Sequence, residues 1–476
     1  MHKQAAQGIQ LSQLAAWLEA PSFGADVLFS GATQDSRSIQ PGQLFVALPG
    51  AHVDGHDYVE QARNNGAVAA LVARQVAVDI PQVVVADVEV ALQRAASAWR
   101  ECLNVQVVAV TGSCGKTTVK QMLMAIFSSQ AETLATAGNL NNQLGVPLTL
   151  LSLLPSHRYA VVEMGASGKG DIELLCDIAK PNVGMITMVA PAHLEGFGSI
   201  EGVANAKAEI YQGLQSNGVA VINSNEQWAS DWQAMGREIG ARAVTFGSDA
   251  LADVSVSRTH CQSWIEGNQA GSRFNLNLPS GVFEVSLPLP GWHNVQNACA
   301  AAAAAIAVGL SAEAIVTGLQ QVRNVAGRLQ ISALANGALL VDDSYNANPA
   351  SVRAAVEWLS GCDLVSRRLL VLGEMAELGD ESAVTHQATG EMVASNKIDG
   401  FWACGDHDAQ AMAKGFGAAA HYHQTHSSLV DELAAELAAG DVLLVKGSRS
   451  AGMDKVVKAV AERIATHSLG DQGHAG

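Results

Sequence analysis

The chain has 476 residues, a formal net charge of -17 and a hydrophobic share of 49%. This length exceeds that of a usual single domain, and about 150 residues per domain suggests roughly three domains, each with its own core. The negative charge argues against a sequence-independent grip on nucleic acid or on an anionic membrane, although local basic loops can still bind phosphate groups.

Cysteine usage and the N-terminal sequence indicate a cytoplasmic protein. The seven cysteines are scattered without C-x-x-C spacing, and an odd number without a pairing pattern suits a reducing compartment. The opening sequence MHKQAAQGIQ lacks the apolar segment of a signal peptide, and the longest apolar run, residues 298–310, is too short to span a bilayer. We expect a soluble monomer without a membrane or nucleic-acid partner.

The first 86 residues are typical of a small α/β domain. Strand-like pieces at residues 43–48 and 83–85 are separated by glycine-rich and polar turns. We place a central domain at residues 87–315, beginning with a helix at residues 91–103.

Residues 105–127, VQVVAVTGSCGKTTVKQMLMAIF, are the most informative stretch, because strand, glycine-rich loop and helix follow without a break. The β-branched run at residues 105–110 suits a buried strand. Apolar residues then recur at i, i+3, i+4 and i+7 on one helical face, namely Val119, Met122, Leu123 and Ile126. This arrangement predicts a site for the phosphates of a nucleotide.

The loop has the chemistry that phosphate binding needs. Gly112 and Gly115 let backbone N–H groups turn toward an anion, Lys116 adds a positive charge, and the Thr117 hydroxyl suits magnesium. The pattern G-x-x-G-K-T is shorter than the standard G-x-x-x-x-G-K-[ST], which indicates a distinct family. The alternative is an ordinary turn with a surface lysine. Cys114 is interpreted as a small neutral residue, not a nucleophile.

Apolar strands recur at residues 159–162, 183–189 and 219–223 and alternate with helical segments, which predicts a largely parallel sheet covered on both faces. Glu163 ends the first of these strands, where its carboxylate can hold magnesium at the ligand-binding edge of the sheet. His193, after the run VGMITMVAPA, is a second candidate. A solvated loop carboxylate and a structural histidine are the alternatives.

Lys207 falls on the apolar face of a predicted helix at residues 199–214, in line with Val203, Ile210 and Leu214. Burial disfavours an ammonium group. Three explanations remain open: snorkelling of the side chain to solvent, a buried ion pair, or a neutral amine that carbon dioxide can modify. A carbamate would turn the amine into a carboxylate-like metal ligand.

Alternating apolar residues on both sides of PSG, within residues 254–289, predict a hairpin and a small antiparallel patch. The segment LPGWHNVQNACAA then places Asn294 and Asn297 at i and i+3 near a helix start, where both amides can face one planar ring. Helix capping is the alternative for Asn294.

A third domain is expected at residues 316–476. Strands at residues 338–342, 369–372, 400–404 and 442–446 predict another, Rossmann-like α/β unit. Polar residues crowd the ends of these strands, in DDSYNANP and in KGSR, and such clusters usually bind something.

These motifs, in their chain order, resemble those of the Mur ligases, ATP-dependent amide-forming enzymes that build the peptidoglycan stem peptide in the cytoplasm. TGSCGKTT stands at the family's shortened phosphate loop, with Ser113 and Cys114 where threonine and asparagine are more usual. VEMG, APAHLEGFGS, ANAKAEIY, LPGWHNVQNACAA, AGR and DDSYNANPAS follow in the family's order, so the resemblance spans essentially the whole chain. DDSYNANPAS and the segment beginning TQDSRSIQPGQ are similar to the branch that adds D-alanyl-D-alanine.

The resemblance implies a role for each matching residue. ATP is expected to contact the loop residues Thr111, Gly112, Ser113, Cys114, Gly115, Lys116, Thr117 and Thr118, and also Asn294, Asn297, Arg328 and Asp343. Two magnesium ions are expected on Thr117, Glu163, His193 and Lys207, with Lys207 carbamylated. Expected substrate contacts are Asp35, Ser36 and Arg37 for the uridine nucleotide, Asn141 and Asn142 for the peptide, and Asn346, Asn348, Lys446 and Ser448 for D-alanyl-D-alanine.

The implied reaction joins D-alanyl-D-alanine to UDP-N-acetylmuramoyl-tripeptide. The γ-phosphoryl group of ATP passes to the tripeptide carboxylate, and the dipeptide amine attacks the resulting acyl phosphate. Because both reactants of the first step are anionic, neutralisation of charge by Lys116, Arg328 and magnesium must supply most of the catalysis. A phosphate-loop kinase and an ATP-driven motor are the competing classes, and both leave Lys207 and the C-terminal polar loops without a role.

Overall fold

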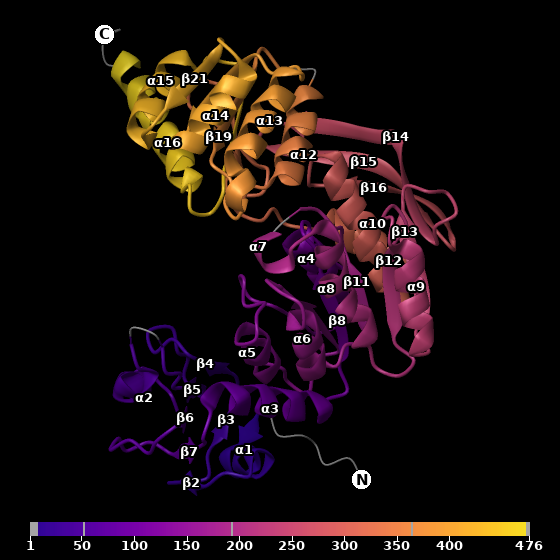
Figure 1. Cartoon of the computed structure of the whole chain (residues 1–476), viewed down its shortest axis with the longest axis vertical. Helices are drawn as coiled ribbons and strands as arrows, with labels where there is room; N and C mark the ends of the chain where they lie inside the picture. Colours follow the sequence, from indigo (N-terminus) through magenta and orange to yellow (C-terminus); the bar gives the residue numbers. More distant parts are fainter. Residues whose placement is uncertain (1–7, 51–52, 192–193, 363–364, 473–476) are drawn as a thin grey trace.

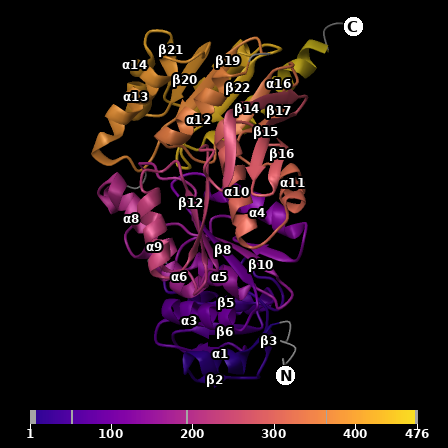
Figure 2. The same ribbon diagram turned by 90° about the vertical axis from the view of Figure 1, so that its right-hand side faces the viewer.

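The computed structural model describes residues 8–50, 53–191, 194–362 and 365–472. Three α/β lobes follow one another along an open C, in which the N-terminal and C-terminal lobes flank a central one (Figure 1). Turned by 90°, the same lobes stack along the long axis of the molecule (Figure 2). The mixed α/β class with mostly parallel sheets, expected from the sequence, is confirmed.

The N-terminal lobe is built on a five-stranded sheet of order β2-β7-β6-β5-β4, in which only β2 runs antiparallel to its neighbour. A separate antiparallel pair joins β1 and β3. The elements are β1 (Ile9–Gln10), α1 (Leu11–Leu18), β2 (Ser22–Phe23), β3 (Leu28–Phe29), β4 (Ala32–Thr33), β5 (Leu44–Val46), the 3-10 helix η1 (Gly55–Tyr58), α2 (Val59–Asn64), β6 (Ala69–Val72) and β7 (Gln82–Val84).

The central lobe contains a nine-stranded sheet of order β16-β15-β14-β13-β12-β11-β8-β10-β9, parallel from β9 to β14 and antiparallel beyond. Its elements are α3 (Val88–Glu101), β8 (Gln106–Thr111), α4 (Lys116–Ser128), β9 (Thr133–Ala135), α5 (Gly145–Leu151), β10 (Tyr159–Glu163), α6 (Asp171–Ala179), β11 (Val183–Ile186), α7 (Leu194–Phe197), α8 (Ile200–Gln212), β12 (Val219–Asn223), α9 (Ala229–Glu238), β13 (Arg242–Gly247), β14 (Val254–Glu266), β15 (Gln269–Leu278), β16 (Gly281–Leu287), α10 (Trp292–Ala307) and α11 (Ala312–Gln320).

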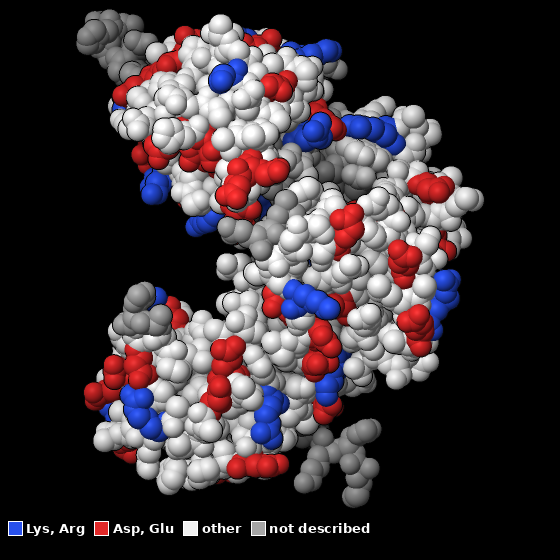
Figure 3. Space-filling model, viewed as in Figure 1, with Lys and Arg blue, Asp and Glu red and all other residues white. Residues whose placement is uncertain are grey.

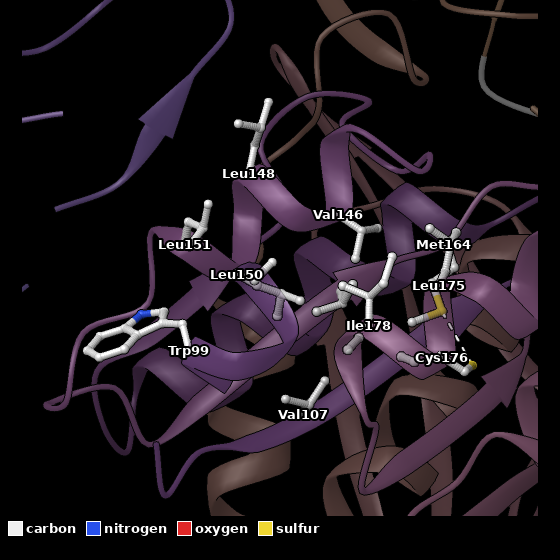
Figure 4. Close-up of a cluster of buried hydrophobic side chains, with 14 of the residues drawn as sticks. Trp99, Val107, Val146, Leu148, Leu150, Leu151, Met164, Leu175, Cys176 and Ile178 are labelled. Atoms are coloured by element: carbon white, nitrogen blue, oxygen red, sulfur yellow. Dashed lines mark hydrogen bonds between the residues drawn. The ribbon is translucent and has the colours of Figure 1, made fainter. Parts of the chain in front are cut away.

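Successive residues of β8 serve two separate cores, as the alternation of side chains in a strand requires. Val107 packs with residues of α3, α5, α6 and α8, whereas Val108 packs with α4, α10 and α11 on the other face. Figure 4 shows Val107 beneath Leu150 of α5 and Ile178 of α6. The sheet is therefore covered on both faces, and β8 is held firmly where the phosphate loop leaves it.

The predicted hairpin is confirmed as β15 and β16, with Phe274 opposite Val285 and Leu276 opposite Phe283. The sequence did not reveal that β14 extends this patch into an arm, pairing with β15 up to Glu266. At the far end of this arm Ala270 belongs to a core of the C-terminal lobe. The arm thus ties the central lobe to the C-terminal one.

The C-terminal lobe has a six-stranded sheet of order β17-β18-β22-β19-β20-β21, parallel except for β17. Its elements are β17 (Gln330–Ala333), β18 (Leu339–Asp343), α12 (Pro349–Ser360), β19 (Arg368–Gly373), the 3-10 helix η2 (Gly379–Glu381), α13 (Ser382–Ala394), β20 (Gly400–Cys404), α14 (His407–Phe416), β21 (Ala420–His423), α15 (His426–Glu436), β22 (Val442–Lys446) and α16 (Met453–Gln472). The four strands predicted for this region are all present.

Two predicted strands are too long, the first being residues 43–48, of which only Leu44–Val46 form β5. We expected residues 183–189, but β11 ends at Ile186. The carbonyl of Met188 instead accepts a hydrogen bond from the N–H of Ser113, so the chain leaves the sheet to meet the phosphate loop. Among the described residues, no helix combines the length and apolar character needed to cross a membrane.

Candidate active site

The glycine-rich loop joins β8 to α4, and two glycines in it have no room for a side chain. Gly115 is the N-cap of α4 with φ of 88°, and a Cβ there would lie 2.5 Å from Oδ1 of Asn297. At Gly112, with φ of 147°, a Cβ would lie 1.9 Å from Oγ1 of Thr187. Both positions require glycine, because L side chains rarely adopt this backbone conformation.

The loop is fastened to the segment that follows β11. Thr187 Oγ1 donates to the carbonyl of Cys114 at 2.5 Å. Ser113 Oγ donates to the carbonyl of Ala190 at 2.9 Å and accepts a bond from the Ala190 N–H at 3.0 Å. The Ser113 side chain thus joins the loop to the backbone of Ala190. Two turns that approach the same edge of the sheet are fixed relative to each other.

Lys116 begins α4 and folds back over the loop. Its Nζ donates to the carbonyl of Gly112 at 2.5 Å. Burial lowers the pKa of Lys116, and the nearby Glu163 carboxylate opposes that shift. The ammonium group is therefore already placed over the loop, where terminal phosphates would sit.

Glu163 ends β10 and is 2% exposed, which excludes the solvated-carboxylate alternative. Asn141 Nδ2 donates to its Oε1 at 2.9 Å, and Nζ of Lys120 lies 3.0 Å from Oε2. Burial alone would raise the pKa of Glu163, but Lys120, Asn141 and Lys116 outweigh it, so this pKa is lowered. The group is an anion.

The donors present suit a magnesium ion, which prefers carboxylate and hydroxyl oxygens. Buried Oε2 of Glu163 faces Nζ of Lys120 and has no other partner among the residues that the structure describes, so a further lone pair remains available to a cation. Thr117, at the first turn of α4, lines the same cavity as Glu163. His193 lies outside the described residues. Within them, no group of three or more His, Cys, Asp or Glu side chains could hold a metal by itself.

Lys207 of α8 is 3% exposed, so the snorkelling explanation is wrong. Its Nζ lies 5.7 Å from the centroid of the Phe197 ring. Burial, with a further contribution from Lys116, lowers the pKa of Lys207 to about 7. A large share of this lysine is therefore a neutral amine near neutral pH.

The start of α10 lies against the phosphate loop. Gly291 is its N-cap, so the capping alternative for Asn294 is wrong. Asn294 Nδ2 donates instead to the carbonyl of Pro290 at 2.7 Å, and Asn297 Nδ2 donates to Oδ1 of Asn294 at 3.3 Å. The two amides form a connected pair, and the second one lies against Gly115.

Polar groups of the C-terminal lobe meet at the ends of β18 and β22. Lys446 Nζ donates to Oδ2 of Asp343 and to the carbonyl of Asn346, both at 2.8 Å. The guanidinium carbon of Arg328 lies 4.4 Å from the centroid of the Tyr345 ring. Buried Nε of Arg328 donates to none of the described residues, so it is free for a ligand.

Asn348 connects this lobe to the phosphate loop. It caps α12 by accepting a hydrogen bond from the Ser351 N–H, and its Nδ2 donates to Sγ of Cys114 at 3.1 Å. The two lobes enclose a cavity of about 790 Å³. The predicted residues that line it are Ser113, Cys114, Gly115, Lys116, Thr117, Thr118, Asn141, Glu163, Asn294, Asn297, Arg328, Asp343, Asn346, Asn348 and Lys446.

Other candidates lie elsewhere. The Thr111 hydroxyl donates to the carbonyl of Met164, Asn142 accepts a hydrogen bond from the Gly145 N–H at the start of α5, and Ser448 Oγ contacts that of Ser450. Gly112 and Lys207 of the central lobe also lie outside the lining of this cavity, and three further candidates belong to the N-terminal lobe. There Asp35 forms a bidentate pair with Arg37, Ser36 donates to Gln61, and Asp35 lines a second cavity of about 430 Å³ between this lobe and residues 134–152.

Sequence reasoning missed several residues at or next to the main cavity, of which Glu226 and Arg258 line it and Lys120 does not. Lys120 is buried beside Glu163, and Glu226 accepts a hydrogen bond from the Val189 N–H at 3.0 Å. Arg258 of β14 pairs with Glu357 of α12 and lies 5.9 Å from the centroid of the Trp292 ring. None of these residues stands out in the sequence: Lys120 lies between Val119 and Gln121, and its partner Glu163 belongs to another strand.

Comparison with known proteins agrees with this geometry. The Mur ligase middle-domain model matches residues 110–305, the Mur ligase glutamate-ligase-domain model matches 327–449, and the Mur ligase catalytic-domain model matches 29–108. A UDP-N-acetylmuramoyl-tripeptide–D-alanyl-D-alanine ligase of Escherichia coli is 43% identical over 95% of this chain and 98% of its own length. The chain belongs to the Mur ligase family.

Other Mur ligases resemble it along nearly the whole chain. The Bacillus subtilis enzyme of the same name is 33% identical over 94% of this chain and 96% of its own. A crystal structure of MurF from Acinetobacter baumannii superposes with a TM-score of 0.85 at 35% identity, covering 96% of this chain and 100% of that one. A MurF ligase from Thermotoga maritima in complex with ADP gives 0.80 at 27% identity, with 92% and 98% covered.

Proposed function

We propose that this Mur ligase joins D-alanyl-D-alanine to UDP-N-acetylmuramoyl-tripeptide in the cytoplasm, using ATP, through an acyl phosphate. The observation that carries the proposal is one cavity in which a phosphate loop, Glu163 and the Asp343–Lys446 pair of another lobe face each other. The names of the relatives support the choice of substrates.

In this scheme the loop amides and Lys116 hold the ATP phosphates, while Arg328 offers its guanidinium group to the charge that develops during transfer. The tripeptide carboxylate attacks the γ-phosphorus, and ADP leaves. The dipeptide amine, held by Asn346, Asn348, Lys446 and Ser448, then attacks the acyl carbon and releases phosphate. The uridine end of the first substrate lies on Asp35, Ser36 and Arg37, and Asn141 and Asn142 adjoin its peptide.

Magnesium, when bound, would neutralise phosphate charge, and Thr117, Glu163, His193 and Lys207 would hold two ions. The neutral amine of Lys207 can attack carbon dioxide, lose a proton and become a carbamate. We keep residues 1–86, 87–315 and 316–476 as the proposed bounds of the domains for the uridine nucleotide, ATP and the dipeptide. We also propose a monomer without nucleic-acid or membrane partners, in keeping with the net charge of -17.

The test is the release of ADP by the purified chain with magnesium and ATP. Release should require both UDP-N-acetylmuramoyl-tripeptide and D-alanyl-D-alanine, and Lys116→Met should abolish it. ADP formed with a hydroxyl acceptor alone would favour a kinase and would refute the proposal.

A further inference from the structure

Lys120 is a lysine that the proposed mechanism does not use. Its side chain is 1% exposed, which makes it one of the largest fully buried side chains of the described chain. An ammonium group this deep costs several kcal/mol in lost hydration unless a partner and hydrogen bonds compensate it. Its contacts should therefore account for its position.

Lys120 joins three elements around the carboxylate of Glu163. Nζ lies 3.0 Å from Oε2 of Glu163 and donates to the carbonyl of Gly138, also at 3.0 Å. On the other side, Asn141 Nδ2 donates to Oε1 of Glu163, and the Glu163 N–H donates to Oγ1 of Thr136. The helix of the phosphate loop, the end of β10 and the loop of residues 136–141 thus converge on one side chain.

An ion pair that served stability alone could lie anywhere in the core. Lys120 does not itself line the cavity, but its partner Glu163 and the adjoining Asn141 do, and Lys116 is one helical turn away from it. Nζ of Lys120 is the one partner of Oε2 among the described residues. Lys120 thus holds the carboxylate through one lone pair of Oε2 and leaves another open to a cation.

We propose that Lys120 is a positioning residue that holds Glu163 toward the metal of the nucleotide and links that carboxylate to the loop of residues 136–141. The inference rests on the proposed function, in which this loop adjoins the peptide substrate. Binding of the metal nucleotide then orders the loop, and the loop in turn strengthens metal binding, as reciprocal coupling requires.

The first experiment measures metal binding without turnover. Mn²⁺ is titrated by electron paramagnetic resonance into the full-length chain with AMP-PNP, for the wild type, Lys120→Met and Lys120→Arg. Loss of a residue that orients a metal ligand weakens metal binding about 10- to 100-fold, which is expected for Lys120→Met. Lys120→Arg keeps the charge and should recover most of the affinity.

The matched control is Lys180→Met, which removes a lysine from another Lys–Glu pair of the central lobe, the exposed pair with Glu101. Its Mn²⁺ affinity should stay within about twofold of wild type, because an exposed pair far from the cavity contributes little. An unchanged or higher affinity in Lys120→Met would overturn the proposal, since it would make Lys120 a mere spectator or a competitor of the metal.

A second experiment needs no variant and so does not depend on how well Lys120→Met folds. Amide hydrogen exchange of the wild type is followed with and without Mg²⁺ and AMP-PNP. Exchange in residues 136–141 should slow when the metal nucleotide binds, and slow much less with AMP-PNP alone. If residues 136–141 exchanged equally fast with and without Mg²⁺ and AMP-PNP, the proposed link between the metal nucleotide and this loop would be overturned. Neither experiment uses the peptide or dipeptide, so a wrong substrate assignment would appear in the ADP assay and not here.

Discussion

Replacement of Gly115 by alanine tests whether the phosphate loop depends on its close contact with α10. The left-handed backbone at this position, with φ of 88°, costs an L residue about 1–2 kcal/mol. The added Cβ would also lie 2.5 Å from Oδ1 of Asn297, and relief of such a contact in a packed region typically costs about 1–3 kcal/mol. The sum is about 2–5 kcal/mol.

Gly170→Ala is a close control. Gly170 is also the N-cap of a helix, α6, with φ of 87°, but a Cβ added there would meet no described atom within 4 Å. It should therefore carry the backbone cost alone. Calorimetric titration should show ATP binding at least about tenfold weaker in Gly115→Ala, since about 1.4 kcal/mol is a factor of ten, and within about twofold of wild type in Gly170→Ala.

Thermal unfolding gives the second readout. The extra cost of about 1–3 kcal/mol in Gly115→Ala corresponds to a further decrease of about 2–12 °C in the melting temperature of a domain of this size. If both variants lost the same stability and bound ATP alike, the contact between Gly115 and Asn297 would not constrain the loop, and the reasoning would be refuted.

Further outcomes are expected for Lys207, for closure of the lobes and for the hydrophobic core. Lys207→Ala should lose most of its turnover and should recover part of it when small carboxylates are added. In the wild type, the activity that depends on carbon dioxide should fall as the pH drops below about 7, because the buried amine of Lys207 then takes up a proton. The free energy of unfolding should rise more steeply between that pH and 10.5 in wild type than in Lys207→Met, since the unfolded Lys207 still binds a proton there and the folded one does not. Small-angle scattering should show smaller dimensions when all substrates or their analogues bind, and no change with all of them present would contradict closure of the lobes. Leu150→Ala, at 0% exposure, should cost about 2–5 kcal/mol in unfolding experiments, whereas Leu251→Ala, at 91%, should stay within about 0.5 kcal/mol.

The closure prediction follows from the shape of the molecule. The space-filling view shows a hollow between the N-terminal and C-terminal lobes, open to solvent on one side (Figure 3). The cavity that holds the phosphate loop and the cavity at Asp35 are separate in this arrangement. A reaction between their ligands therefore requires a long substrate, a movement of lobes, or both, and an acyl phosphate must be protected from water meanwhile.

Patterns confined to one element could be read from the sequence. The face of Val119, Met122 and Ile126 places α4 on the sheet, and the apolar register of Phe274 and Leu276 predicts the hairpin, because each pattern depends on near neighbours in the chain. The apolar helical face around Lys207 marks this lysine as unusual but leaves three explanations open, of which burial in the structure excludes snorkelling. These features needed no knowledge of distant residues.

Features that depend on contacts between distant segments were not visible. β11 ends early because Met188 pairs with Ser113 on another strand's loop. Lys120 reads as a surface lysine until β10 places Glu163 beside it. Asn294 is a candidate cap in the sequence because asparagine favours that position. In the structure Gly291 is the N-cap, so the helix begins earlier and the side-chain amide of Asn294 is not needed for capping.

The local arrangement of cations explains how a chain with a net charge of -17 can bind polyanions. Lys116 and Lys446 each donate to a backbone carbonyl, of Gly112 and Asn346, so neither ammonium group is neutralised fully by its carbonyl partner. Lys446 and Lys120 are also paired with carboxylates, whereas Nε of Arg328 is buried and unengaged among the described residues. Buried charges are screened by salt much less than surface charges. We therefore expect a few fixed cations near the cavity to govern phosphate binding, with little influence from the acidic surface.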